Sequence, residues 1–511
     1  MYPLFSLVVG FSLLSAVSAT ATIPDKIYGV NLGSWLVLEP WMLPGEWLRM
    51  GGQDCDNCAD CIRSEFAFVQ AYPHTADEKF NEHWNTWFTQ DDVNELKSLG
   101  INTVRIPLGY WIVEALVDRR TEFYPRGGIK QLRRGLQQLK NAGIVAILDH
   151  HALPGVSSPN QMFAGRCTSD VEFYTDYNYH RALIWAAVMT GLSHLHPDFS
   201  SVFAIEAVNE PIMDANQTPG YGDYQKKFVE TVRAMESLLG VNGNRRRRDV
   251  SASLNVTSVF DDMMHKGPCG FGLEICQALL EALPILTDIS FELPGFNLGS
   301  IFGLNKQPPL MTNFMDVSWQ FNNPSNPADA AIGPQGYDNH LYYSFGGVAD
   351  PNPDAYMRSI CNLQRVQNAV RNRNIPLWFG EWGLPTQFSA SDAFLFDWAD
   401  AQKLAYSKSA GWIFWNFKIE ISKEAGSLAR QWSYVEGVRR GYFTRDPAAV
   451  HNPHVCDPFI GPASSTTTAS STTTAAPDST AALNSTVLTS APAADSTVIT
   501  NSTTSNSSTT V

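Results

Sequence analysis

Between Ile23 and Pro462 the chain repeats one arrangement of hydrophobic and polar positions. A short apolar run, often rich in β-branched residues, precedes a longer stretch whose apolar residues recur with helical spacing. Strands that alternate with helices in this way are typical of a parallel sheet. The apolar runs predict strands at Tyr28–Leu32, Thr103–Ile106, Val145–Leu148, Val202–Val208, Leu310–Val317, Asn339–Tyr343, Leu377–Gly380 and Trp412–Phe417.

Helical spacing is clearest in a few of the stretches between these strands. They are Asp91–Leu99, Ile129–Asn141, Tyr224–Leu239 and Ala393–Ser407. Gly100 and Gly143 follow the first two, as expected where a residue in the left-handed conformation ends a helix. Eight strands with intervening helices are what closes a barrel, so we predict an α/β fold of the (β/α)8 or TIM-barrel type.

The repeat is interrupted over residues 240–307, which separate the helix after the fourth strand from the fifth strand. We interpret this stretch as an insertion after the fourth βα unit. It contains a run of arginines, Arg245 to Arg248, followed by Asp249. Such a basic run is typical of a solvated loop, and it also suits the proteases that process exported precursors, so both interpretations stay open.

The two ends of the chain differ in composition from the part between them. Residues Leu4 to Val17 are apolar but too few to span a bilayer, and residues 16–19 are mostly small, which predicts a signal peptide over residues 1–19. Residues 463–511 are rich in Ser and Thr and hold no Lys, Arg or aromatic residue. Such a segment cannot bury enough apolar surface to fold, which predicts a disordered, O-glycosylated tail. The repeating part then forms one domain over residues 20–462.

Charge and cysteine content narrow the class of protein. Acidic residues outnumber basic ones by 50 to 36, and the formal charge of −14 repels phosphate backbones, which argues against nucleic acid as a partner. After the signal peptide, no stretch is apolar and long enough to cross a membrane. The 8 cysteines predict structural disulfides in an exported chain, with a connectivity that their spacing leaves open. A metal site at Cys55, Cys58 and Cys61 is disfavoured because no matching Cys or His pair stands at zinc-site spacing.

The residues that end the predicted strands carry the candidate chemistry, because a parallel barrel places its active site at the carboxyl ends of its strands. Two of these ends carry a glutamate, Glu210 after the fourth strand and Glu381 after the seventh. Two opposed carboxyl groups can break a glycosidic bond, since one protonates the leaving oxygen while the other attacks or activates water. Arg105 and His340, at other strand ends, can give the two carboxyls different pKa values.

Motifs at these strand ends resemble those of a known family. They are Tyr28–Trp41 (YGVNLGSWLVLEPW), Val104–Pro107 (VRIP), Asn209–Pro211 (NEP), Gly380–Gly383 (GEWG) and Gly411–Trp415 (GWIFW). Together they resemble glycoside hydrolase family 5, and within it the fungal exo-β-1,3-glucanases. The resemblance runs through most of residues 27–457 and lapses in the insertion at 240–307.

The resemblance implies a retaining mechanism in a clan A barrel, with Glu210 as acid/base and Glu381 as nucleophile. It also implies a set of substrate-binding residues. By this resemblance, Asn209 binds the sugar 2-hydroxyl, Arg105 lies beside the nucleophile, and Glu39 lies in the innermost sugar subsite. Trp415 is a platform for the sugar. The remaining members are His151, after the third strand, and the pair His340 and Tyr342 of the sixth strand. One motif departs from the family, because the segment from His150 to Gly155 reads HHALPG where the glucanases usually read LHGAPG. Linkage preference and exo or endo action depend on such loops and stay open.

These observations predict a secreted or wall-associated retaining β-glucosidase of the glucan 1,3-β-glucosidase type, which acts on β-1,3-glucan in fungal cell-wall metabolism through a glycosyl-enzyme intermediate. Other retaining hydrolases of the family, namely an endo-β-1,6-glucanase, a mannanase or an endo-β-1,4-glucanase, would share both glutamates. A carbohydrate-binding wall protein without turnover and a transglycosylase are the remaining alternatives. We expect a monomer that binds β-glucan and uses no metal or organic cofactor. His150 and His151 are adjacent on a strand, so they point in opposite directions and cannot both face one metal ion.

If residues 463–511 form no part of the core, their removal should change neither the stability nor the activity of the protein. A variant that ends at Pro462 should keep the activity and the cooperative unfolding of the full chain, because the removed residues offer no apolar face. Thermal unfolding followed by circular dichroism, together with hydrolysis of a β-glucan, measures both properties. A lower or broader unfolding transition would show that the tail is structural.

Overall fold

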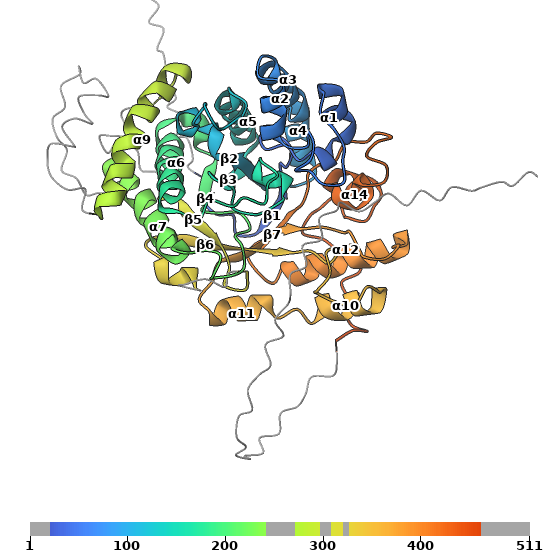
Figure 1. Ribbon diagram of the computed structural model, residues 1–511. Helices are drawn as coiled ribbons and strands as arrows, with labels where there is room; N and C mark the ends of the chain where they lie inside the picture. Colours follow the sequence, from blue (N-terminus) through green and yellow to red (C-terminus); the bar gives the residue numbers. More distant parts are fainter. Residues whose placement is uncertain (1–20, 242–270, 297–307, 320–325, 461–511) are drawn as a thin grey trace, which may run out of the picture.

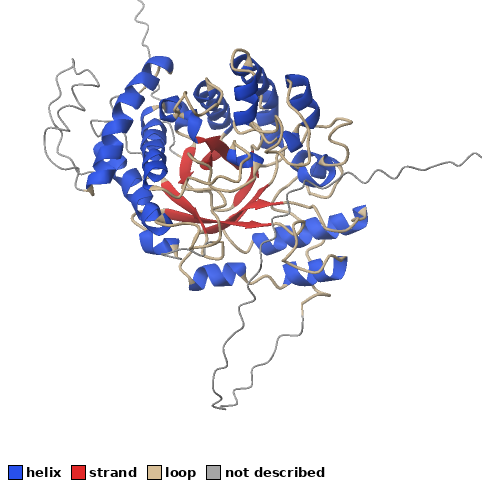
Figure 2. Cartoon of the chain, in the orientation of Figure 1, coloured by secondary structure: helices blue, strands red, loops and turns tan. Residues whose placement is uncertain are grey.

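Eight parallel strands close into a barrel at the centre of the molecule (Figure 1), and helices surround it (Figure 2). The structure is a computed structural model that describes residues 21–241, 271–296, 308–319 and 326–460. The strands follow one another around the barrel in chain order, and neighbouring strands pair in parallel. The predicted (β/α)8 TIM barrel is therefore confirmed. The expected signal peptide and the Ser/Thr-rich tail lie outside the described residues.

All of the predicted strands are present, and their boundaries differ at some ends. They are β1 (Ile27–Asn31), β2 (Thr103–Gly109), β3 (Val145–Ala152), β4 (Val202–Glu206), β5 (Met311–Met315), β6 (Gln335–Leu341), β7 (Leu377–Trp382) and β8 (Gly411–Phe414). The largest difference is at β6, which begins at Gln335 and not at Asn339 as predicted. Gln335, Asp338 and Asn339 are polar but buried, with hydrogen-bond partners inside the protein. A search for apolar runs therefore starts this strand too late.

The outer layer consists mainly of α-helices. They are α1 (Pro44–Met50), α2 (Glu65–Ala71), α3 (Ala76–Trp87), α4 (Gln90–Ser98), α5 (Gly128–Ala142), α6 (Asp176–Leu195), α7 (Tyr221–Leu238), α9 (Leu273–Glu292), α10 (Pro353–Cys361), α11 (Arg365–Arg371), α12 (Asp392–Tyr406), α13 (Ala429–Trp432) and α14 (Tyr434–Arg439). The predicted helices correspond to α4, α5, α7 and α12. Gly143 caps α5 with a φ of 77°, and Gly100 follows α4 with a φ of 70°, as predicted. No helix in the described ranges is both long enough and apolar enough to cross a bilayer.

The insertion at 240–307 contributes a helix of its own. Its described part includes α9, which packs against α6 and α7 on the outside of the barrel (Figure 1). Because α9 covers α6, the side chains of α6 are buried on nearly every face. A helix buried all round shows no amphipathic period, which is why the sequence pattern did not reveal α6. The run Arg245–Arg248 lies outside the described residues.

The barrel interior is divided into an apolar layer and a polar layer. The apolar layer lies toward the amino ends of the strands and includes Ile27, Ile147, Phe203, Met311, Trp378 and Ile413. Buried polar residues follow one to four positions later on several of the same strands. On three neighbouring strands, Asp149, Glu206 and Asn313 are paired in register, so their positions are side by side. The polar layer therefore lies below the carboxyl ends of the strands, where a barrel active site is expected.

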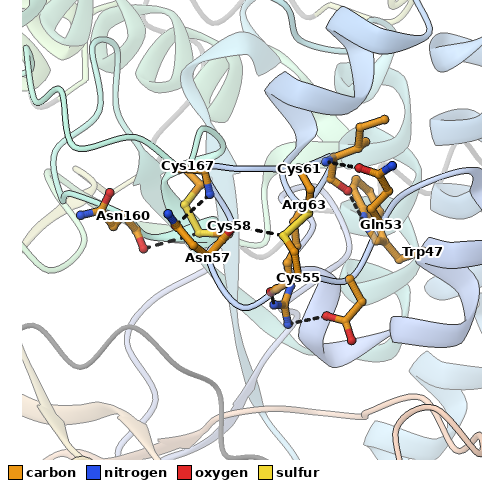
Figure 3. Close-up of a disulfide and its surroundings, with 12 residues drawn as sticks. Trp47, Gln53, Cys55, Asn57, Cys58, Cys61, Arg63, Asn160 and Cys167 are labelled. Carbon is orange, nitrogen blue, oxygen red and sulfur yellow. Dashed lines mark hydrogen bonds and ion pairs between the residues drawn. A yellow bond between two sulfur atoms is a disulfide. The ribbon is translucent and has the colours of Figure 1, made fainter.

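Disulfides close one short loop and join two pairs of segments that are far apart in the sequence. Cys55 pairs with Cys61, Cys58 with Cys167, and Cys361 with Cys456, which confirms the prediction of structural disulfides over a metal site. Figure 3 shows the first two of these bonds, which interlock because Cys58 stands inside the loop that Cys55 and Cys61 close. Cys58–Cys167 ties the segment before α2 to the loop between β3 and α6. Cys276 is disulfide-bonded as well, and Cys269 lies outside the described residues.

Glu65, the first residue of α2, is fully buried and supports the loop after β1. Its Oε1 accepts a hydrogen bond from the backbone N of Leu38 at 2.7 Å. Burial raises the pKa of Glu65 to about 8. In the unfolded chain this carboxyl titrates near 4.5, so the folded protein binds one more proton than the unfolded chain between these two pH values.

The stability that this proton provides is complete below about pH 4.5 and is lost as the pH rises toward about 8. Glu65→Gln keeps an acceptor for Leu38 and needs no proton. The variant should therefore unfold with nearly the wild-type free energy at pH 4.5 and be more stable than wild type, by about 1 kcal/mol or more, at pH 8. Urea unfolding at the two pH values measures the difference. The exposed Glu78→Gln on α3 should show no such crossover, and equal behaviour of the two variants would contradict the argument.

Candidate active site

Arg105 lies at the centre of the polar layer and links the ends of several strands. Its side chain, on β2, is fully buried. The guanidinium donates to Glu206 from Nε, to Glu381 from Nη1 and to Asn209 from Nη2, each at 2.8 Å. Asp149 on β3 lies 3.1 Å from Nη1. One side chain therefore fixes the ends of β3, β4 and β7 relative to β2.

Burial opposes the charge of Arg105, but the surrounding carboxylates outweigh burial and hold its pKa well above the usual range. The same burial acts against the carboxyls. It raises the pKa of Asp149 to about 7 and that of Glu206 to about 8, although the guanidinium attracts both charges. Asp338 and Glu381 also face Arg105. Several acidic groups thus surround one guanidinium, and buried carboxyls such as Glu206 retain protons at neutral pH.

Glu381, on β7, is held by donors on both of its oxygens. Oε1 accepts from Arg105, and Oε2 accepts from the Tyr342 hydroxyl at 2.9 Å. Burial raises the pKa of Glu381 to about 8, while His340 and Arg105 oppose the rise. These donors favour the carboxylate form, which a nucleophile requires, and they limit the opposite effect of burial, which is the larger of the two.

Glu210 follows β4 and faces the same space. Its φ is 40°, in the left-handed region that residues other than glycine rarely adopt. Its Oε1 lies 2.8 Å from His340 Nδ1, and its side chain is 20% exposed, against 6% for Glu381. One oxygen of Glu210, one oxygen of Glu381 and a ring nitrogen of His340 all lie within 4.8 Å of one another. Closure of the barrel therefore brings the two glutamates together.

His340, on β6, stands between the two glutamates. Its Nδ1 is 3.5 Å from Glu381 Oε2, and its Nε2 is 3.7 Å from Asp338 Oδ2. Burial disfavours the charged imidazole, but Glu381 and Asp338 outweigh burial and raise the pKa of His340 well above its usual value. A charged His340 donates to Glu210 and stabilises negative charge on Glu381.

The adjacent histidines of β3 face opposite sides of the strand, as predicted. His151 Nδ1 is 2.6 Å from Asp149 Oδ2, and the His151 ring is nearly parallel to Trp415, with ring centroids 5.6 Å apart. Burial holds the pKa of His151 well below its usual value, so this ring is neutral. His150 stacks on Trp185 of α6 with ring centroids 3.9 Å apart. One histidine therefore belongs to the site, and the other packs behind the strand.

Glu39, after β1, completes the predicted set. Its Oε2 accepts from Trp41 Nε1 at 2.9 Å, and the residue is 6% exposed. Burial raises the pKa of Glu39 to about 7. The Trp41 bond opposes this rise, and the charge of Glu210 adds to it. The predicted residues thus form one connected group: Glu39, Arg105, His151, Asn209, Glu210, His340, Tyr342, Glu381 and Trp415.

Two further groups of residues belong to the site and were not predicted from the sequence. Asp149, Glu206 and Asp338 are buried carboxyls inside strands, and the signal of the first two is a charged residue directly after an apolar run. Aromatic rings at the mouth are the second group. Phe163 meets His151 edge to face at 5.5 Å, and Trp319 meets His340 edge to face at 5.5 Å. Both stand on loops, whose course a sequence pattern does not predict.

Among the residues that the structure describes, two sets of side chains are close enough to share a cation, one of Glu206, Asp338 and His340 and one of Glu210, His340 and Glu381. His340 belongs to both sets. Because its pKa is raised, it carries a proton and repels a cation instead of binding it. The buried guanidinium supplies the positive charge that these carboxylates need. The donor set therefore suits proton transfer better than metal binding.

Relatives with similar sequences match most of this chain. Glucan endo-1,6-beta-glucosidase B of Emericella nidulans is 30% identical over 445 residues, which cover 84% of this chain and 88% of that protein. A probable glucan endo-1,6-beta-glucosidase B of Neosartorya fischeri is 30% identical over 441 residues, 84% of this chain and 90% of that one. A glucan 1,3-beta-glucosidase of Blumeria graminis is 34% identical over 188 residues, 37% of this chain and 41% of that protein.

Among solved structures, the rutinosidase from Aspergillus niger matches with a TM-score of 0.54 and 18% identity, and covers 83% of this chain and 100% of that one. This likeness shows the shared fold alone. The family model described as cellulase (glycosyl hydrolase family 5) matches residues 70–420, which include β2 to β8 and both glutamates. The motifs predicted from the sequence, their meeting at one end of the barrel and this match agree, and the chain belongs to glycoside hydrolase family 5.

Proposed function

We propose that this protein is a secreted retaining β-glucanase that hydrolyses β-1,6-linked glucan through a covalent glycosyl-enzyme intermediate. The observation that carries the proposal is the approach of Glu210 and Glu381, whose oxygens come within 4.8 Å of each other. Retaining glycosidases keep their carboxyl groups about 5 to 5.5 Å apart, whereas inverting enzymes leave about 6.5 to 9.5 Å for a water molecule. The observed approach supports direct attack on the sugar.

The surroundings of the two glutamates support different roles. Glu381 receives donors on both oxygens, so its carboxylate is stabilised and directed as a nucleophile. Glu210 is the more exposed of the two, so it can reach a leaving oxygen and later a water molecule. In the first step Glu381 attacks the anomeric carbon while Glu210 protonates the leaving oxygen. In the second step Glu210 takes a proton from a water molecule. The water oxygen bonds to the anomeric carbon, and the bond between the sugar and Glu381 breaks.

The identity of the acceptor in the second step decides between hydrolysis and transglycosylation. A sugar hydroxyl that reached Glu210 before water would give a longer glucan from the same intermediate. We assign hydrolysis as the main reaction because the matched relatives are named as glucosidases.

The β-1,6 linkage rests on the relatives and not on the two glutamates. Proteins named as glucan endo-1,6-beta-glucosidases match 84% of this chain. Loops of this kind determine which linkage reaches the catalytic pair. The disulfides Cys55–Cys61, Cys58–Cys167 and Cys361–Cys456 support an extracellular protein, since such bonds are typical of oxidising compartments.

A second candidate is the β-1,3-glucosidase that the sequence motifs predict. Relatives named as glucan 1,3-beta-glucosidases match 37% and 49% of this chain at 34% and 28% identity. The local identity is as high as for the β-1,6 relatives, but it extends over a smaller part of the chain. A β-1,3 activity is therefore the alternative outcome of the substrate test.

The roles of the two glutamates are tested with azide. Glu381→Ala should lose turnover, and azide should restore a glycosyl azide of inverted configuration by attack from the vacated face. Glu210→Ala should lose about 10²- to 10⁴-fold in kcat on glucan, and with an activated aryl glycoside azide should give a product of retained configuration. Nuclear magnetic resonance of the azides assigns the anomers. Glu78→Ala, on the exposed face of α3, should keep full activity; exchanged anomers would reverse the roles.

The linkage is tested on pustulan, laminarin, mannan and cellulose in parallel, with the products separated by chromatography. We expect turnover of pustulan to exceed that of laminarin at least tenfold, and oligosaccharides to appear before glucose if attack is internal. A preference for laminarin with glucose as the sole product would support the β-1,3 exo-enzyme instead. Absence of turnover on all four polymers would contradict the proposed function.

A further inference from the structure

Glu210 adopts a backbone conformation that its own sequence does not favour. A backbone region such as that at a φ of 40° is sparsely populated, and it raises the conformational free energy of a residue other than glycine by about 1 to 3 kcal/mol. Glu210 also precedes Pro211, and the ring of a proline pushes the preceding residue toward extended backbone. An extended Glu210 would send its carboxyl in another direction. Neighbouring elements must therefore hold the observed conformation.

The loop between β3 and α6 supplies two such contacts. Ser158 Oγ donates to the backbone O of Glu210 at 2.9 Å. The Tyr174 hydroxyl accepts from the backbone N of Ile212 at 2.8 Å and donates to the backbone O of Ser157 at 3.0 Å. These bonds hold the backbone at Glu210 and two residues beyond it. Ser158 and Tyr174 are buried, so water does not compete freely for these groups.

The same loop is itself held rigidly. The disulfide Cys58–Cys167 ties it to the segment before α2, and the backbone N of Asn160 donates to the backbone O of Thr168 at 2.7 Å. Figure 3 shows Asn160 beside this disulfide. The loop can therefore transmit a fixed position from the disulfide to the backbone after β4.

We propose that Ser158 and Tyr174 are positioning residues that set the direction of the Glu210 carboxyl, a role that rests on Glu210 being the acid/base of the proposed function. Without the Ser158 hydroxyl the carbonyl of Glu210 loses its donor, and the backbone relaxes toward extended conformations. The carboxyl then leaves its place beside His340. Glu381 is held separately, by Arg105 and Tyr342, and keeps its position.

This separation predicts a loss of acid catalysis with retained nucleophilic attack. The value of kcat/KM reports the steps up to the first bond cleavage, and that cleavage needs an acid when the leaving group is poor. Ser158→Ala should lower kcat/KM about 5- to 30-fold for phenyl β-glycosides and less than 2-fold for 2,4-dinitrophenyl β-glycosides. Tyr174→Phe should act in the same direction. Ser158→Thr keeps the hydroxyl and should restore most of the activity.

Ser157 provides the matched control. It is adjacent to Ser158 and fully buried, and its Oγ meets no hydrogen-bond partner among the described residues. Ser157→Ala should leave kcat/KM unchanged for both leaving groups. Thermal unfolding of every variant shows whether a loss of activity follows from a loss of folded protein.

The outcomes separate this inference from the function on which it rests. If Ser158→Ala lowers kcat/KM equally for both leaving groups, or behaves like Ser157→Ala, the positioning role is wrong. Glu210→Ala must show a still larger dependence on the leaving group than Ser158→Ala. If Glu210→Ala shows no such dependence, the assignment of Glu210 as acid/base, and with it the proposed function, is wrong.

Discussion

The buried charge of Arg105 is the constraint on which the active end of the barrel depends. An ion without partners inside a protein costs several kcal/mol, and removal of one partner from a buried pair typically costs about 3 to 5 kcal/mol. Arg105 meets this cost through Glu206, Asn209 and Glu381, which come from the ends of β4 and β7. The barrel thus cannot shift these strand ends without leaving a charge unpaired. The catalytic geometry and the stability of the polar layer are consequences of the same set of contacts.

The same layer sets the electrostatic surroundings of Glu381. Burial raises the pKa of Asp149, Glu206 and Glu381, because a single guanidinium cannot neutralise all of the acids around it. His340 responds in the opposite direction and becomes charged. Burial and the two cations, Arg105 and His340, therefore act on the Glu381 carboxyl in opposite directions.

The sequence predicted the parts of this structure that have a local pattern. Apolar runs predicted all of the strands, and glutamates at two strand ends predicted a carboxyl pair that the closed barrel does bring together. The helix α6 (Asp176–Leu195) was not predicted, because α9 buries the face that would otherwise be polar. The role of Glu206 was also missed, since its place after an apolar run marks it as unusual but does not identify Arg105 as its partner. Both failures have one cause, because α9 and Arg105, which bury α6 and pair with Glu206, lie far from them in the sequence.

Strands and loops position different residues of the site. The strands fix Arg105 and Glu381, which belong to the interior and depend little on loops. Glu210 lies after the end of β4, and its backbone depends on Ser158 in the loop between β3 and α6. That loop also carries Phe163, which contacts His151 at the mouth of the site. A change in this loop would therefore alter acid catalysis and substrate fit together. Loops commonly set specificity on a shared barrel, and the contacts of Ser158 and Phe163 connect this loop both to the backbone of Glu210 and to His151.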